Sequence, residues 1–209
     1  PIFEASSNHR YDTSDYMKID AMLGTDEEFA RFIQTLHDND MHLILDGVFS
    51  HVGRHSQYFN YDGAYGKHNG AARNPHSLYF SWFEFDHYPD RYRSWWGIKD
   101  LPQINKEDES FQDFIFKADE SVVAHWLDKG IDGWRLDVAD ELPDEFIQGI
   151  RYQLNHFKDK VLIGEVWEDA SNKVSYNTRR KYILGDHLHS VMNYPFRDAV
   201  LDLLNHQKT

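Results

Sequence analysis

Short apolar runs alternate with longer amphipathic stretches along this 209-residue chain, and this order restricts the fold to a few architectures. The predicted strands cover residues 41–49, 131–139, 160–167 and 189–196. The predicted helices cover residues 26–39, 111–129, 143–158, 171–182 and 197–206. Successive strands that are joined through helices need crossover connections, which are right-handed and produce a parallel sheet. The pattern therefore predicts an α/β fold.

One connection breaks this regular order. The stretch between the strand at 41–49 and the helix at 111–129 is too long for an ordinary loop, and it is rich in Tyr, Phe and Trp. It predicts a small inserted subdomain over residues 52–102, with residues 1–51 and 103–209 forming the main α/β domain. Each of these aromatic side chains suits the core of the insert as well as it suits a ligand surface.

Composition excludes several classes of function. The formal net charge of −13 argues against nucleic-acid and acidic-membrane partners, whose phosphates would repel the chain. The absence of Cys excludes disulfides, a thiol nucleophile and a zinc–cysteine site. There is no apolar run that could span a membrane and no signal-peptide pattern, so we expect a cytoplasmic protein. The chain begins at Pro1 without an initiator Met, which predicts a fragment of a longer protein.

Acidic residues stand at the ends of three predicted strands, at Asp46, Asp137 and Glu165. Parallel α/β folds build their sites at the carboxyl ends of strands, so these side chains should face one crevice. Alternation places Arg135 beside Asp137, where its charge should lower the pKa of Asp137. The apolar run before Glu165 should instead raise the pKa of Glu165. One ionised and one protonated carboxyl group, about 5–5.5 Å apart, is the pair that retaining glycoside hydrolysis uses.

Each of these features has a simpler interpretation. A single Asp at a strand end is usually a loop or helix cap, and a single Arg–Asp pair is more often structural than catalytic. Three acids beside an aromatic-rich insert together favour a carbohydrate cleft, because sugar rings stack on aromatic faces. A metal site is not predicted, since His51, His55 and His68 are too irregularly spaced for a ligand set.

Three segments carry a resemblance to a known family. Residues 46–51 (DGVFSH), 133–138 (GWRLDV) and 164–167 (GEVW) resemble successive signature regions of the alpha-amylase family of glycoside hydrolases. This resemblance implies that the chain is an interior piece of a (β/α)₈ barrel, covering about strands two to six, with a small domain inserted after strand three.

Further segments resemble one branch of that family. Residues 1–5 (PIFEA), 8–16 (NHRYDTSDY) and 101–105 (LPQIN) are similar to segments of the neopullulanase, cyclomaltodextrinase and maltogenic amylase branch. The branch implies retaining hydrolysis, with transglycosylation, of α-glucosidic bonds in cyclodextrins, pullulan or maltooligosaccharides. Its partner is therefore an α-glucan oligosaccharide, and its N-terminal domain often supports a homodimer.

The resemblance also implies roles for individual residues. Asp137 would be the nucleophile, and Glu165 the general acid and then the general base. The implied substrate-binding residues are Tyr11, Asp46, His51, Arg135, Glu141 and Trp167, of which Glu141 and Trp167 line the acceptor side of the cleft. No metal ligand is assigned.

The chain departs from the family pattern in several places. Ser50 stands where the family often has an Asn that binds calcium, which weakens the prediction of a calcium cofactor. Asp140 replaces a usual Asn and Glu168 a common His, and both changes concern acceptor preference. The third acid of the family would lie beyond Thr209, so we expect the isolated 209-residue chain to be poorly active.

Alternative functions remain open from the sequence. Within the family, the chain could belong to an oligo-1,6-glucosidase or α-glucosidase, which product analysis on pullulan would distinguish. Outside catalysis, it could be an amylase-like sugar-binding scaffold. The presence of Asp137, Glu165 and Arg135 together argues against a scaffold.

Overall fold

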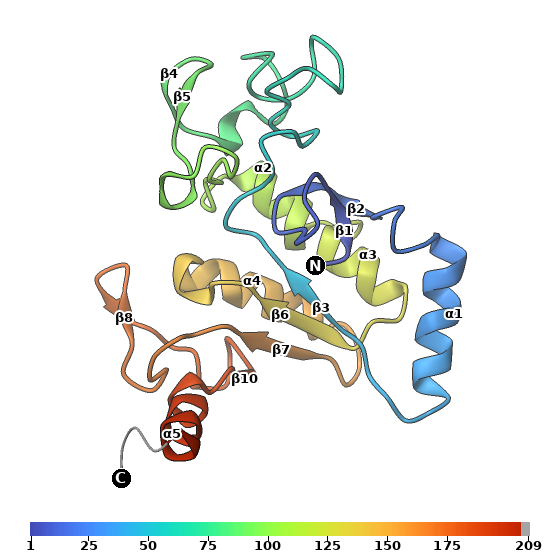
Figure 1. Ribbon diagram of the computed structural model, residues 1–209, viewed down its shortest axis with the longest axis vertical. Coiled ribbons are helices and arrows are strands. Elements are labelled where there is room, and N and C mark those ends of the chain that lie inside the picture. The colour runs from blue at the N-terminus through green and yellow to red at the C-terminus, as the bar shows by residue number, and fades with distance from the viewer. Residues whose placement is uncertain (206–209) are drawn as a thin grey trace.

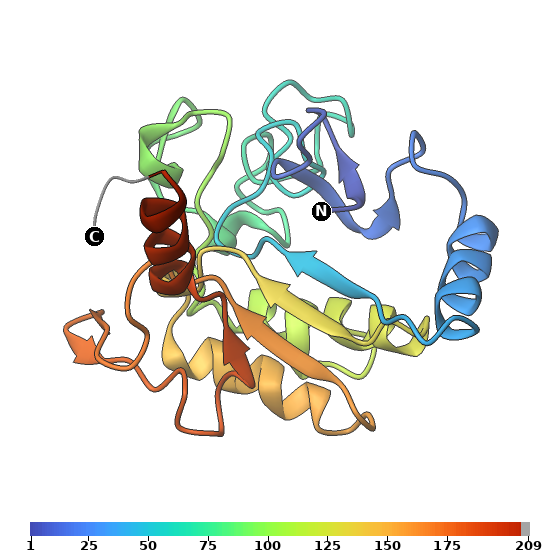
Figure 2. The same ribbon diagram turned by 60° about the horizontal axis from the view of Figure 1, so that its bottom comes forward.

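A four-stranded parallel sheet is the centre of the computed structural model, which describes residues 1–205. The strand order is β10-β7-β6-β3, and each neighbouring pair is parallel. The strands are β3 (Ile44–Gly47), β6 (Gly133–Leu136), β7 (Val161–Gly164) and β10 (Ser190–Val191). Figure 2 shows them side by side, with α3 and α4 against one face. The predicted parallel α/β arrangement is confirmed.

Helix caps explain where the main helices begin. Helix α1 (Asp26–His37) starts with a capping box, in which Thr25 accepts from the Glu28 N–H and the Glu28 carboxylate accepts from the Thr25 N–H. Ser121 caps α3 (Val122–Asp128) through its side chain. Helix α4 (Asp144–Leu154) follows Pro143, and Asp144 and Glu145 lie in its first turn, where the helix dipole favours negative charge.

The core lies between the sheet and these helices. Trp134 and Leu136 of β6 are fully buried, as alternation along the strand predicts for side chains that face the helices. The ring of Trp134 packs 5.7 Å from Phe49, which in turn lies 6.4 Å from Phe146 of α4. Arg135 lies on the opposite face of β6, where its side chain contacts the acids at the strand ends.

Two predicted helices are wrong in the structure. The stretch 111–129 is interrupted: α2 (Glu109–Gln112) and a π-helical turn (Asp113–Lys117) end before Ser121 starts α3. The stretch 171–182 instead forms a short hairpin of β8 (Val174–Ser175) and β9 (Thr178–Arg179). Tyr176 and Asn177 both have positive φ angles, the conformation of a tight two-residue hairpin turn.

The C-terminal boundary also differs from the prediction. The predicted strand 189–196 is reduced to β10, because Asn193 caps α5 (Tyr194–Leu204) and Pro195 occupies its first turn. Residues 206–209, which include the last residue of the predicted helix 197–206 and the end of the predicted domain 103–209, lie outside the described part. None of the described helices combines the length and apolar character needed to cross a bilayer.

The N-terminal segment corrects the expected strand count. Strands β1 (Phe3–Ala5) and β2 (Thr13–Ile19) pair antiparallel with each other and stand apart from the parallel sheet. Among residues 1–205 the sheet therefore holds four parallel strands, one fewer than strands two to six would give. Of the segments before β3, those in strands thus form a separate antiparallel pair and add no strand to the parallel sheet.

Residues 52–102 form an irregular lobe above the sheet (Figure 1), with only short elements such as β4 (Phe85–His87) and β5 (Arg91–Tyr92). An isolated bridge between His51 and Gln103 brings its two ends together. Many of its rings pack on one another; the ring of Phe59 lies 4.9 Å from that of Phe83. The limits of the insert as a separate domain stay a prediction.

Candidate active site

One guanidinium joins the three predicted acids. Arg135 Nη1 lies 2.5 Å from Asp46 Oδ1 and 2.9 Å from Asp137 Oδ1, and its Nη2 lies 2.9 Å from Glu165 Oε1. Asp46 belongs to β3, and Asp137 and Glu165 directly follow β6 and β7, so parallel pairing carries all three to the same end of the sheet. The structure therefore brings the three acids to one wall.

The bend after β6 holds Asp137 and Glu165 relative to each other. Val138 has φ 44° and ψ 58°, a left-handed conformation that is rare for a β-branched residue. This conformation directs the Val138 N–H to Glu165 Oε2 at 3.0 Å, and the Ala139 N–H donates to the Glu165 carbonyl oxygen at the same distance. Backbone hydrogen bonds thus fix the acid after β7 to the bend that carries Asp137.

The protonation order is the reverse of the sequence prediction. Burial and the neighbouring charges of Asp46 and Glu165 raise the pKa of Asp137 to about 7, despite the opposing effect of Arg135. Burial also acts to raise the pKa of Glu165, but hydrogen bonds from Trp167, the Val138 N–H and Tyr194 together with Arg135 outweigh it and lower that pKa. The prediction failed because two neighbouring carboxylates raise the pKa of Asp137, and because Glu165 receives hydrogen bonds from the β6 bend, from Tyr194 of α5 and from Trp167.

The raised pKa of Asp137 predicts a dependence of stability on pH. Between about pH 4 and pH 7 the folded protein retains a proton at Asp137 that the unfolded chain has released, so stability should fall as pH rises through this window. Asp137→Asn removes this titration, and the stability difference should move in favour of the variant by about 1.4 kcal/mol per pH unit. Urea unfolding of both proteins between pH 4.5 and 7.5, taken as approximate experimental limits, measures it. A constant difference would contradict the raised pKa.

Tyr11 and His51 border the acids on the β3 side. The Tyr11 hydroxyl donates to Asp46 Oδ2 at 3.0 Å, and burial together with Asp46 raises the pKa of Tyr11 to about 12. His51 Nε2 donates to the Tyr11 carbonyl oxygen at 3.1 Å, and the Ser50 hydroxyl lies 2.9 Å from His51 Nδ1. Burial lowers the pKa of His51 to about 4, so its imidazole is neutral at neutral pH.

Tryptophans connect Glu141 to the insert. The Glu141 carboxylate accepts from Trp95 Nε1 at 2.7 Å and from Trp96 Nε1 at 2.8 Å. The ring of Trp96 lies edge-on to Trp167 at 6.0 Å, and the ring of Trp95 lies 5.0 Å from His51. The insert therefore adds two indole rings beside the predicted residues Glu141, Trp167 and His51.

Tyr194 is a site residue that the sequence reasoning missed. Its hydroxyl donates to Glu165 Oε1 at 2.9 Å from the start of α5. Its position near the end of the fourth predicted strand, 189–196, was the available signal, since the other three predicted strands also carry site residues near their ends. Trp95 and Trp96 were visible only as two of many aromatic residues in the insert.

Other singled-out residues lie in different contacts. His55 pairs with Asp62 at 3.0 Å, and His68 uses its carbonyl oxygen to accept from Asn74. Asp140 and Glu168 are linked through Lys173, whose Nζ lies 3.2 Å and 2.5 Å from their carboxylates. The two departures from the family pattern thus share one lysine.

Comparison with known proteins gives a consistent result. The alpha-amylase family profile, described as the alpha amylase catalytic domain, matches residues 1–209. An amylopullulanase of Thermoanaerobacter thermohydrosulfuricus is 38% identical over 98% of this chain, and neopullulanase 2 of Thermoactinomyces vulgaris is 32% identical over 96%. The chain spans only 15% and 32% of the lengths of these relatives.

A solved structure agrees in fold. The ligand-free cyclic alpha-maltosyl-(1→6)-maltose hydrolase of Arthrobacter globiformis superposes with a TM-score of 0.81 at 28% identity. The match covers 97% of this chain and 43% of that protein. The described sheet and its helices therefore correspond to part of a larger catalytic domain.

Proposed function

Because this chain belongs to the alpha-amylase family of glycoside hydrolases, we propose that the protein containing it cleaves α-glucosidic bonds in pullulan, cyclodextrins or maltooligosaccharides with retention of configuration. The observation that carries this proposal is the contact of Asp137 and Glu165 with the same Arg135 guanidinium. Retaining hydrolysis requires two carboxyl groups on opposite sides of one bond, close enough to share a substrate.

In the proposed first step, the Asp137 carboxylate attacks the anomeric carbon while Glu165 gives its proton to the departing glycosidic oxygen. The products are a glycosyl ester on Asp137 and a free sugar hydroxyl. In the second step Glu165 takes a proton from water, which attacks the anomeric carbon and releases Asp137. Arg135 contacts both carboxylates, and its charge stabilises Asp137 when it departs as a carboxylate.

The acid role of Glu165 needs a proton that the observed contacts do not favour, because its pKa is lowered. A further carboxylate facing Glu165 would raise this pKa by like-charge repulsion. The family resemblance implies such a third acid from residues outside this chain, and we propose that it completes the site.

The tryptophan surface supports the proposed sugar acceptor side. Trp96 and Trp167 are 68% and 41% exposed, which leaves their apolar rings available for stacking against sugars. Glu141 holds Trp95 and Trp96 through their indole N–H groups. We propose that this surface, formed by Trp95, Trp96, Trp167 and Glu141, binds the acceptor and thereby supports transglycosylation.

The residues around Ser50 do not suit calcium. Ca²⁺ takes six to eight oxygen ligands, whereas the Ser50 hydroxyl is fully buried and lies 2.9 Å from an imidazole nitrogen. The proposed reaction therefore uses no calcium ion at this position. The homodimer and the cytoplasmic location stay predictions for the whole protein.

Product analysis tests the proposed reaction. The full-length protein is incubated with pullulan, and the products are followed by proton NMR in the first minutes, before mutarotation. We expect panose or maltose whose new reducing end is in the α configuration, because two displacements at one carbon restore its configuration. A β-anomer would contradict the retaining mechanism. Glucose released from short oligosaccharides, with pullulan left intact, would favour the oligo-1,6-glucosidase or α-glucosidase alternative.

A further inference from the structure

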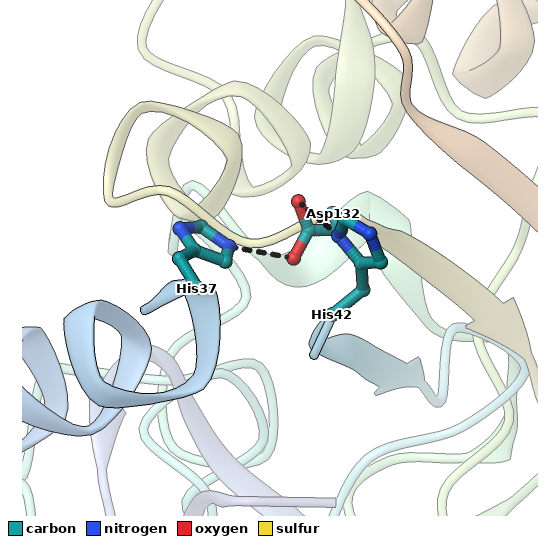
Figure 3. A group of neighbouring side chains, drawn as sticks. All are labelled: His37, His42 and Asp132. Carbon is teal, nitrogen blue, oxygen red and sulfur yellow. Dashed lines mark hydrogen bonds and ion pairs between the residues drawn. The ribbon is translucent and has the colours of Figure 1, made fainter. Parts of the chain in front are cut away.

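Two histidines and an aspartate gather at the end of the sheet opposite the acids. His37 is the last residue of α1, His42 precedes β3, and Asp132 immediately precedes β6. Figure 3 shows the two imidazoles on either side of the Asp132 carboxylate. His37 Nε2 lies 2.9 Å from Asp132 Oδ2, and His42 Nδ1 lies 3.5 Å from Asp132 Oδ1. Three sequence segments thus meet at one carboxylate.

Asp132 is a fixed and charged centre for this cluster. Its Oδ2 accepts the Leu43 N–H at 2.8 Å, which holds the carboxylate between the starts of β3 and β6. Lys160 Nζ lies 3.5 Å from the other oxygen of Asp132, Oδ1. A carboxylate oxygen is one of the ligand types that Zn²⁺ binds.

We propose that His37, His42 and Asp132 bind one divalent transition-metal ion of the zinc type. Among residues 1–205 these three form the one group whose potential ligand atoms all lie within 4.8 Å of one another. Imidazole nitrogen and carboxylate oxygen suit Zn²⁺, which binds both at about 2.0–2.2 Å, and ligand atoms around a tetrahedral ion lie roughly 3.3 Å apart. The two imidazole nitrogens lie 2.9 Å and 3.5 Å from the two different oxygens of Asp132, so the groups are close enough for small side-chain rotations to bring them around one ion.

The position of the site assigns it a structural role. The cluster connects α1 and β3 to β6, and its members His37 and Asp132 are 95 residues apart along the chain. The acids Asp46 and Asp137 lie at the other ends of these strands, so the ion would not touch the substrate. An ion that binds only the folded protein stabilises it by mass action, and we expect the melting temperature to rise with Zn²⁺ concentration.

Lys160 provides an internal test because its charge opposes the ion. Its Nζ lies 3.5 Å from Asp132 Oδ1, where a bound cation would repel it. Lys160→Gln should therefore increase the affinity for the metal ion. If the three side chains only form structural hydrogen bonds, this substitution should not change the metal affinity. His42→Gln removes one ligand from a side chain that is 76% exposed, so the fold should be unaffected.

The experiment measures Zn²⁺ binding to the full-length protein by calorimetry, and Co²⁺ binding by visible absorption, which reports a tetrahedral site. We expect one site whose affinity falls by at least about tenfold in His42→Gln, rises in Lys160→Gln, and stays unchanged in His76→Gln, an exposed histidine of the insert. Equal affinity in the native protein and in His42→Gln would overturn the proposal. An unchanged or weaker affinity in Lys160→Gln would remove Asp132 as a ligand and overturn it equally.

Discussion

Asp137→Asn is expected to lower turnover of pullulan by the full-length protein on the order of 10⁴-fold, since the amide cannot form the glycosyl ester. The neutral side chain keeps the shape of the original, so substrate should still bind. Initial rates on pullulan with both proteins measure the effect. The matched control is Asp159→Asn, on the exposed loop before β7, where the residue has a positive φ angle that Asn also tolerates.

Azide distinguishes loss of the nucleophile from general damage to the site. A small external anion can occupy the space left by the Asp137 carboxylate and attack the anomeric carbon from the same side. Azide should then restore cleavage of an activated glucosyl substrate and give a product of inverted configuration. A fully active Asp137→Asn variant would refute the nucleophile assignment, and so would a rescued product of retained configuration.

Glu165→Gln is expected to lower turnover of maltooligosaccharides by about 10³-fold, within the range that general acid catalysis supplies. The loss should be much smaller on an aryl glucoside whose leaving group departs without a proton. Comparing the two substrates therefore isolates the protonation step. In this variant the nucleophile remains, so azide should give a product of retained configuration.

The structure supplies a control for the second substitution. Glu107 is an exposed acid just after the insert and has no role in the proposed mechanism, so Glu107→Gln should leave both rates unchanged. If Glu165→Gln lost equal activity on both substrates, its role would be to hold Arg135 and the Val138 bend and not to donate a proton. Turnover equal to the native rate on both would remove Glu165 from the mechanism.

The positions of the three acids could be predicted because they depend on short-range rules. The apolar runs that contain β3, β6 and β7 predict strands, and parallel pairing aligns their carboxyl ends. Asp46, Asp137 and Glu165 then follow from their places at the ends of these runs. Nothing more than strand periodicity and crossover handedness was needed to bring them together.

The remaining features depend on contacts between distant segments. Tyr194 reaches Glu165 from a helix that begins 29 residues later, and its donated hydrogen bond helps to lower the pKa of Glu165. The segment 171–182 has helical periodicity, but Arg180 ties it to Asp144 at 2.6 Å and to the Leu142 carbonyl oxygen. Such tertiary contacts override local propensity, so neither the protonation order nor the hairpin could be read from the sequence.

The left-handed bend at Val138 has a consequence for how this scaffold can change. Since main-chain amides of the bend hold Glu165, part of the link between Asp137 and Glu165 runs through the polypeptide backbone, in addition to the side-chain contacts of Arg135 and Tyr194. These amides belong to residues 138 and 139 and not to the lobe that contains Trp95 and Trp96. If that lobe selects the glucan, as we propose, exchanging it should leave this backbone link between Asp137 and Glu165 in place.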